Sequence, residues 1–311
     1  MFKFRKLFLL GGLIGVMLAA GCSDGEIGET GGVSASSPEM FEYAENEDGK
    51  IMITGLTEEG MKEEKLSVPK KIDGKGVMGI AEYAFRDCDA LEELTLPDTI
   101  TVIENNAFQG CGDLKGNVPM VSFYEQEDGT LCITGMTDEN GAKALTIPDN
   151  ILGKKVTSIQ YDAFRECRIE SVELPETLES IGSSAFRECY YLKEVILPEG
   201  LKTIEEKAFM KCIFLELAYI PSTVEEIPES CFEDCGNLLT VIIRDGVKSI
   251  GENAFRGTSK LHSLSIPASV EQISDSAFRR GIGVYYITIF TPAGSYAESF
   301  ARLRGITVIP E

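Results

Sequence analysis

Apolar residues recur along this chain with a long period rather than with the short period of an isolated helix or strand. The dipeptide Ala-Phe returns every 22 or 23 residues over most of its length, and Ile stands four residues before each Ala. The Phe residues of this series are Phe85, Phe108, Phe164, Phe186, Phe209, Phe232, Phe255 and Phe278, with Cys replacing Ala before Phe232. Eight matching units indicate a repeat array, in which each coil buries its apolar edge against its neighbours.

Each unit also predicts its own strands and turn. The run before a recurrent Pro alternates, as in residues 91–97 (LEELTLP), and this period of two predicts a short strand with one face inward. Pro then ends the pairing, because it has no N–H to donate. A second short apolar pattern follows, as in residues 247–250 (VKSI), and the Ala-Phe segment turns the chain with Phe inside. We therefore expect parallel strands stacked from coil to coil and joined by short helical turns.

Two hairpins are predicted where the array begins. Residues 41–55 and 123–135 match closely, and each segment carries Asp-Gly between two alternating runs, which is a strong hairpin signal. The second segment explains the single interval of 56 residues, between Phe108 and Phe164. We expect one continuous solenoid over residues 41–311. Two flexibly joined parts, residues 41–120 and 121–311, are the alternative.

The C-terminal segment predicts a cap for the open end of the array. Ala297, Phe300, Ala301 and Leu303 stand at helical spacing, and Gly305 occupies the position of a C-terminal cap glycine. A stacked array needs such a terminal element, because its last coil would otherwise leave a sheet edge open.

The N-terminal segment predicts export. Lys3, Arg5 and Lys6 precede an apolar run over residues 7–20, shorter than the roughly 20 residues of a spanning helix and typical of a secretory signal. The run ends in LAAGC at Cys22, which resembles a bacterial lipobox. That resemblance implies removal of residues 1–21 and attachment of lipid to Cys22. An ordinary secreted protein cleaved near Ala20 is the alternative. The polar residues 22–40 are expected to form a flexible tether.

Composition narrows the classes of function. The formal net charge of −21 argues against nucleic-acid binding, which requires a basic surface. The only His, His262, has no second His to serve a Ser or Cys dyad, and no Gly-x-Ser-x-Gly motif is present. We therefore predict a non-enzymatic protein without a metal or another cofactor.

The cysteines follow the repeat. Six of the nine stand three residues after a repeat Phe, at Cys88, Cys111, Cys167, Cys189, Cys212 and Cys235. A residue type fixed to one repeat position is typical of a small buried apolar side chain, so we expect a ladder of free thiols. Disulfides are the alternative, because they are common in exported proteins. Cys132 and Cys231 are expected to be packing variants.

The repeat pattern resembles a known family. The Leu-x-x-Leu-x-Leu-Pro strand and the Val-x-x-Ile-x-x-x-Ala-Phe-x-x-Cys continuation, over about residues 57–290, are similar to the BspA-like (treponemal-type) branch of leucine-rich-repeat bacterial surface proteins. The resemblance implies a right-handed, β-rich leucine-rich-repeat solenoid. It also implies export and an adhesive or host-interaction role.

Most outward-facing strand positions of the array are expected to carry polar residues, but those in the middle of the array do not. Apolar or aromatic residues stand there at Ile196, Leu217, Tyr219, Leu239 and Ile242, with Tyr286 further along. Contiguous exposed apolar residues tend to mark interaction sites. We expect a monomeric, lipid-anchored surface protein that binds a protein or glycan of host or neighbouring cells through these residues, preferably a protein or peptide. The alternatives are a partly covered face, a glycan- or nutrient-capturing lipoprotein, and a structural envelope protein.

Overall fold

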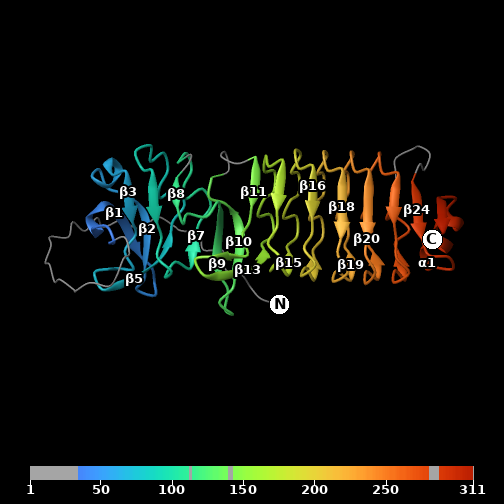
Figure 1. The fold of residues 1–311 in the computed structure, drawn as a ribbon, viewed down its shortest axis with the longest axis horizontal. Helices are drawn as coiled ribbons and strands as arrows, with labels where there is room; N and C mark the ends of the chain where they lie inside the picture. The colour runs from blue at the N-terminus through green and yellow to red at the C-terminus, as the bar shows by residue number, and fades with distance from the viewer. Residues whose placement is uncertain (1–33, 112–113, 139–142, 280–286, 311) are drawn as a thin grey trace. The chain divides into compact units, whose positions relative to one another are not determined.

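Strands of successive coils lie side by side in this protein (Figure 1). The computed structural model describes residues 34–111, 114–138, 143–279 and 287–310. Residues 34–311 form one unit. The predicted signal sequence, Cys22 and residues 22–33 of the predicted tether lie outside the described residues, as does Tyr286.

Strands at the repeat position that precedes Pro in most coils, together with the C-terminal strand, form three parallel sheets. The first joins β3 (Lys65–Ser67), β6 (Glu93–Thr95) and β8 (Lys115–Gly116), and the second joins β11 (Ala144–Thr146) and β14 (Ser171–Glu173). The third contains β16 (Glu194–Ile196), β18 (Leu217–Ile220), β20 (Thr240–Ile243), β22 (Ser263–Ser265), β24 (Thr288–Thr291) and β25 (Thr307–Pro310). The parallel-stranded solenoid predicted from the repeats is confirmed.

A second set of strands comprises the two hairpins and the strands that follow the Pro position of the coils. One 11-stranded sheet contains β1 (Phe41–Glu45), β2 (Ile51–Leu56), β4 (Lys71–Ile72), β5 (Lys75–Ile80), β7 (Val102–Ile103), β9 (Val121–Glu125), β10 (Leu131–Met136), β12 (Asn150–Ile151), β13 (Lys154–Ile159), β15 (Ser180–Ile181) and β17 (Thr203–Ile204). A three-stranded sheet of β19 (Glu226–Ile227), β21 (Ser249–Ile250) and β23 (Gln272–Ile273) follows. Two short 3-10 helices, η1 (Pro38–Met40) and η2 (Gly60–Lys62), accompany the first hairpin.

Both predicted hairpins are present. β1 pairs antiparallel with β2, and β9 pairs antiparallel with β10. The second hairpin is built into the sheet, because β7 pairs with β9 on one side and β10 pairs with β13 on the other. The same sheet therefore runs through both predicted sections of the chain. The domain boundaries themselves stay a prediction.

The core is a stack of phenylalanine rings. From Phe164 to Phe278 the ring centroids of successive coils lie 5.1–5.6 Å apart, with the planes within 18° of parallel. The turns are linked as well: the backbone N–H of Phe186 donates to the carbonyl of Ala208 in the next coil at 2.8 Å, and Phe232 does so to Ala254. The residues two before and two after the Phe have positive φ in these turns, as Lys207 and Lys211 do around Phe209.

A helix closes the C-terminal end, as predicted. In α1 (Tyr296–Leu303), Ala297, Phe300 and Ala301 are buried, and Phe300 packs edge-on against Phe278 at 6.1 Å. Gly305 has a positive φ of 65°, as expected of a cap glycine. Leu303, expected on the same face, is instead 83% exposed. It lies too far around the helix to reach the core, because two residues after Ala301 the helix has turned by about half a revolution.

Candidate functional site

The sheet strip is the row of apolar side chains predicted on the outer strand face. Ile196 of β16 pairs with Tyr219 of β18, and Tyr219 pairs with Ile242 of β20. Ile196 is 66% exposed and Ile242 is 36% exposed, whereas Tyr219 is half-buried. Because stacked strands lie about 4.8 Å apart, these three side chains form one continuous row on the surface.

Two more of the predicted residues adjoin this row. Leu217, at the start of β18, is 36% exposed and pairs with Glu194 and Thr240. Leu239, just before β20, is half-buried. The structure therefore brings Ile196, Leu217, Tyr219 and Ile242 together on one side of neighbouring strands, with Leu239 just before β20.

Polar groups hold the central tyrosine. The Tyr219 hydroxyl donates a hydrogen bond to Glu199 Oε1 at 3.1 Å, and the Arg244 guanidinium carbon lies 5.9 Å from the ring centre. Desolvation and the Glu199 carboxylate raise the pKa of Tyr219 above its ordinary value. The phenol therefore stays neutral at physiological pH and offers its ring as an apolar surface with a fixed polar tip.

The sequence analysis missed a second apolar group, the turn cluster, in the turns that lead into β16 and β18. It consists of Tyr190, Tyr191, Ile213 and Phe214, all of them exposed. The rings of Tyr191 and Phe214, about half exposed, are parallel within 3° with centroids 6.3 Å apart. A sequence signal existed: the two residues between the repeat Cys and Leu are small or polar in other coils, as in Gly236-Asn237 and Ser259-Lys260.

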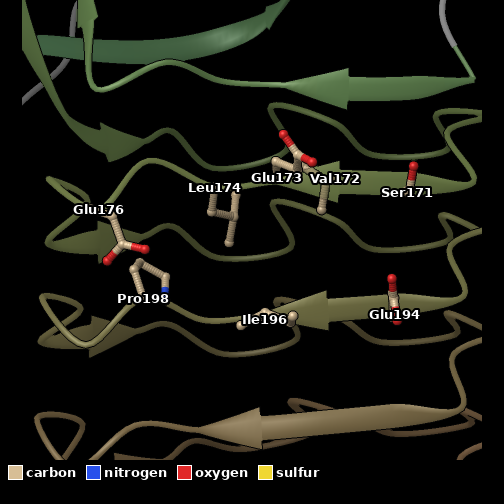
Figure 2. A pocket seen from close by; sticks show the side chains of 8 residues that line it. All are labelled: Ser171, Val172, Glu173, Leu174, Glu176, Glu194, Ile196 and Pro198. Atoms are coloured by element: carbon tan, nitrogen blue, oxygen red, sulfur yellow. The ribbon is translucent and has the colours of Figure 1, made fainter.

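A pocket of about 390 Å³ lies where the second and third parallel sheets meet. The sheet of β14 ends there and the sheet of β16 begins. Figure 2 shows Ser171 and Glu173 on one strand, with Glu194 and Ile196 on the strand beside it. The other lining residues are Val172, Leu174, Glu176 and Pro198. Ile196 thus belongs to both the pocket and the sheet strip.

The pocket combines apolar walls with carboxylates. Val172 and Pro198 are buried and Leu174 is half-buried, whereas Glu173, Glu176 and Glu194 are exposed. Glu173 Oε2 accepts a hydrogen bond from Thr146 Oγ1 at 3.0 Å. Within the described residues, the Glu176 and Glu194 carboxylates have neither a hydrogen-bond nor an ion-pair partner.

The predicted cysteine ladder lies inside the coils. Cys88, Cys189, Cys212 and Cys235 are buried, and Cys111 and Cys167 are half-buried. Four thiols donate to the carbonyl of the Phe one coil earlier, as Cys212 Sγ does to Phe186 at 3.1 Å. Burial raises the pKa of the Cys212 thiol well above its ordinary value. The two expected packing variants, Cys132 and Cys231, are buried as well.

Other chemistry is sparse in the part of the chain that the structure describes. It contains no group of three or more His, Cys, Asp or Glu side chains arranged to hold a metal ion. His262 is exposed, and its Nδ1 lies 3.3 Å from the carbonyl oxygen of Lys260. No helix within those ranges is long and apolar enough to cross a membrane.

Comparison with known proteins gives one family match and several structural likenesses. A model described as the BspA type leucine rich repeat region matches residues 65–122 and 157–283, in six copies. No curated protein sequence matches.

Three solved structures illustrate the likeness. A leucine-rich-repeat protein of T. pallidum is 25% identical with a TM-score of 0.38, over 73% of this chain and 91% of that one. One from Bacteroides capillosus is 32% identical with a TM-score of 0.35, over 41% of this chain and 96% of that one. The pneumococcal vaccine antigen PcpA is 20% identical with a TM-score of 0.38, over 87% of this chain and 83% of that one.

Proposed function

The chain belongs to the BspA-type leucine-rich-repeat family, and we propose that it is a non-enzymatic cell-surface protein whose exposed sheet face binds a protein or peptide. The observation that carries this proposal is the sheet strip, in which Ile196, Tyr219 and Ile242 stand in register on adjacent strands. Apolar patches on a soluble surface tend to be contact sites, and solenoids bind on such extended surfaces.

The turn cluster enlarges this surface with rigid aromatic area. Phe214 precedes Leu217 by three residues, so the turn cluster leads directly into the sheet strip. Aromatic side chains dominate binding energy at interfaces because they bury a large area and lose few rotamers. We therefore place the centre of the contact between Phe214 and Tyr219.

The proposal is tested by probing arrays of synthetic peptides, extracellular-matrix proteins and glycans with the full chain. The variant Tyr219→Ser/Ile242→Ser should weaken binding to peptide or protein spots by about tenfold or more, since truncation of a central aromatic contact typically costs at least about 2 kcal/mol. Tyr161→Ser, which removes an exposed tyrosine from the turn after β13, is the matched control and should leave binding unchanged.

Thermal unfolding separates binding from folding in this test. Both variants should melt close to the unsubstituted chain, because the replaced side chains lie on the surface. Equal binding by Tyr219→Ser/Ile242→Ser and the unsubstituted chain would refute the proposal. An absence of hits on every array would favour a structural role in the envelope.

Glycan capture is a second candidate, favoured by the parallel exposed rings of Tyr191 and Phe214. Such rings can stack on the apolar face of a sugar. In that case the glycan spots would bind, and Tyr191→Ser/Phe214→Ser would weaken binding more than the sheet-strip variant.

We further propose that the chain is exported and anchored by lipid on Cys22. The LAAGC sequence ending at Cys22 and the short apolar run before it support this. Anionic headgroups would repel this chain, because its net charge of −21 becomes more negative once residues 1–21, with Lys3, Arg5 and Lys6, are removed. Acyl chains would hold it at the membrane nevertheless. Metabolic labelling with palmitate should mark the unsubstituted protein and leave Cys22→Ala unlabelled. Label retained by Cys22→Ala would exclude this anchor.

A further inference from the structure

The pocket between β14 and β16 differs from the rest of the strand face because two sheets meet there without pairing. The coil that carries Phe164 is one residue shorter than the next, with Pro175 eleven residues after its Phe and Pro198 twelve residues after Phe186. The sheet divides at this shorter coil. The opening reaches from exposed Glu173 and Glu194 inward to buried Val172.

Several acidic side chains elsewhere in the array are paired across the coils. Lys193 binds Glu170, Lys202 binds Glu179, and Lys211 binds Glu188, each with a nitrogen–oxygen distance of 3.1 Å or less. Lys248–Glu225 and Arg256–Glu233 repeat this arrangement at the same spacing of 23 residues. Coil-to-coil ion pairing is therefore one recurrent way in which this array compensates carboxylates, although exposed Glu226 and Glu252 have no ion-pair partner among the described residues.

The pocket lacks that compensation. Among the described residues, no Lys or Arg forms an ion pair with Glu173, Glu176 or Glu194, and only Glu173 has a hydrogen-bond donor, Thr146. These carboxylates surround apolar walls formed by Leu174, Ile196 and Pro198. The surface thus offers negative charge beside apolar side chains in an open pocket, next to the sheet strip.

We propose that this pocket receives an arginine side chain of the bound protein or peptide. The three methylene groups of arginine match the apolar walls, and the guanidinium forms charge-assisted, often bidentate hydrogen bonds with carboxylates. Glu173 and Glu194 are the acceptors on the two strands that border the pocket. This assignment rests on the proposed function, because it names the chemistry of the partner for the same face.

Methyl NMR of the full chain tests the pocket with Nα-acetyl-arginine amide, and with Nα-acetyl-citrulline amide as its neutral isostere. The arginine probe should shift the methyl signals of Val172, Leu174 and Ile196 in a saturable way, and the citrulline probe should bind at least about tenfold more weakly. Glu173→Gln/Glu194→Gln should weaken the arginine probe by a similar factor. Glu226→Gln/Glu252→Gln, which removes two exposed carboxylates elsewhere, should change nothing.

Three results would overturn the assignment: no saturable shift with the arginine probe, equal binding of the citrulline probe, or undiminished binding by Glu173→Gln/Glu194→Gln. The sheet-strip variant Tyr219→Ser/Ile242→Ser should keep the arginine response, because it leaves the pocket residues in place. If that variant loses array binding while the arginine probe fails, the proposed function stands and the pocket assignment falls. If the arginine probe binds and Tyr219→Ser/Ile242→Ser keeps its array binding, the pocket binds arginine but the sheet strip is not the contact surface.

Discussion

Single side chains carry most of the packing in each coil. The repeat Phe fills the centre of its turn, and Phe209 is fully buried between Phe186 and Phe232 at centroid distances of 5.3 and 5.4 Å. A ring in this position contacts both neighbouring coils at once. Its loss would therefore open a cavity that no single coil can close.

We expect Phe209→Ala to lower the free energy of unfolding by about 3–5 kcal/mol, the usual cost of truncating a buried Phe. Phe214→Ala is the matched control, because that ring is about half exposed, and it should cost less than about 1 kcal/mol. Chemical denaturation followed by circular dichroism measures both. Equal losses in the two variants would show that the ring stack does not hold the coils together.

The thiols are the second feature at this scale. Cys111 is half-buried, and the neighbouring Cys88 thiol lowers its pKa, whereas burial raises the pKa of Cys189, Cys212 and Cys235. The reactive species of a cysteine is the thiolate. The cysteines that share this repeat position should therefore differ in their reactivity towards alkylating reagents.

Alkylation with iodoacetamide should modify Cys111 first in the folded protein and leave Cys189, Cys212 and Cys235 unmodified. After unfolding without a reductant, mass spectrometry should find all six repeat cysteines alkylated. Three bridges among these positions would instead show that the ladder is a set of disulfides. The same digest reports both outcomes.

At the scale of elements, the terminal helix α1 depends on its first turn. The Ser295 hydroxyl accepts a hydrogen bond from the N–H of Glu298 at 3.1 Å and pairs with the buried hydroxyl of Thr291 at 2.9 Å. Glu298 Oε2 in turn accepts from the N–H of Gly294. These contacts fix the helix over the last coil, where it packs against β24 and the edge strand β25.

Ser295→Ala should lower the free energy of unfolding by about 1–2 kcal/mol, because it removes the cap and leaves Thr291 without this partner. Hydrogen exchange should become faster in β24 and β25 before it does so in β16 and β18, since each coil contacts only its neighbours. Ser299→Ala, on the exposed side of the same helix, should have almost no effect. Unchanged exchange in Ser295→Ala would mean that the helix does not protect the end of the sheet.

At the scale of the whole molecule, charge is ordered along the array rather than spread at random. The formal net charge is −21, yet many carboxylates pair with a cation exactly one coil away. Glu188 is buried and binds two cations, Lys211 and Arg187. A hydrogen bond from Lys211, assisted by its charge and by Arg187, lowers the pKa of Glu188.

A carboxyl group with a lowered pKa in the folded state stabilises that state above its unfolded pKa of about 4.3, and this stabilisation is lost as the pH falls through the folded pKa. The unsubstituted chain should therefore have a higher free energy of unfolding than Glu188→Gln above about pH 5. This difference should disappear in stronger acid. Urea denaturation from pH 7 down to pH 3 measures it. A difference in the free energy of unfolding that stays constant over this range would show that the pairing of Glu188 does not depend on its charge.

Much of the fold could be predicted from local sequence. The Asp-Gly hairpins and the cap glycine each depend on a few neighbouring residues, and the 23-residue repeat is found by comparing units along the chain. These features can therefore be recognised without knowledge of tertiary contacts. The short second strands, such as β15 and β17, were indicated only as an apolar pattern, because two residues carry little periodicity. The direction of Leu303 was wrong for a different reason, since its spacing is helical but the rotation after Ala301 carries it away from the core.

Part of the candidate site could be predicted from the sequence and part could not. Ile196, Tyr219 and Ile242 could be placed on one face because strand alternation and equal spacing fix their register. Tyr191 and Phe214 were missed because they lie in turns, where side-chain direction follows no simple period.

The sequence by itself determined the coil, its inward phenylalanine and cysteine, and the apolar strand positions that remain outside, because every coil meets the same neighbours and repeats the same pattern. Only the tertiary structure decided that the second hairpin is built into the sheet, where the strand face divides, and which carboxylates remain unpaired beside β14 and β16. Those features depend on how coils of unequal length meet, and such contacts join residues that are far apart along the chain.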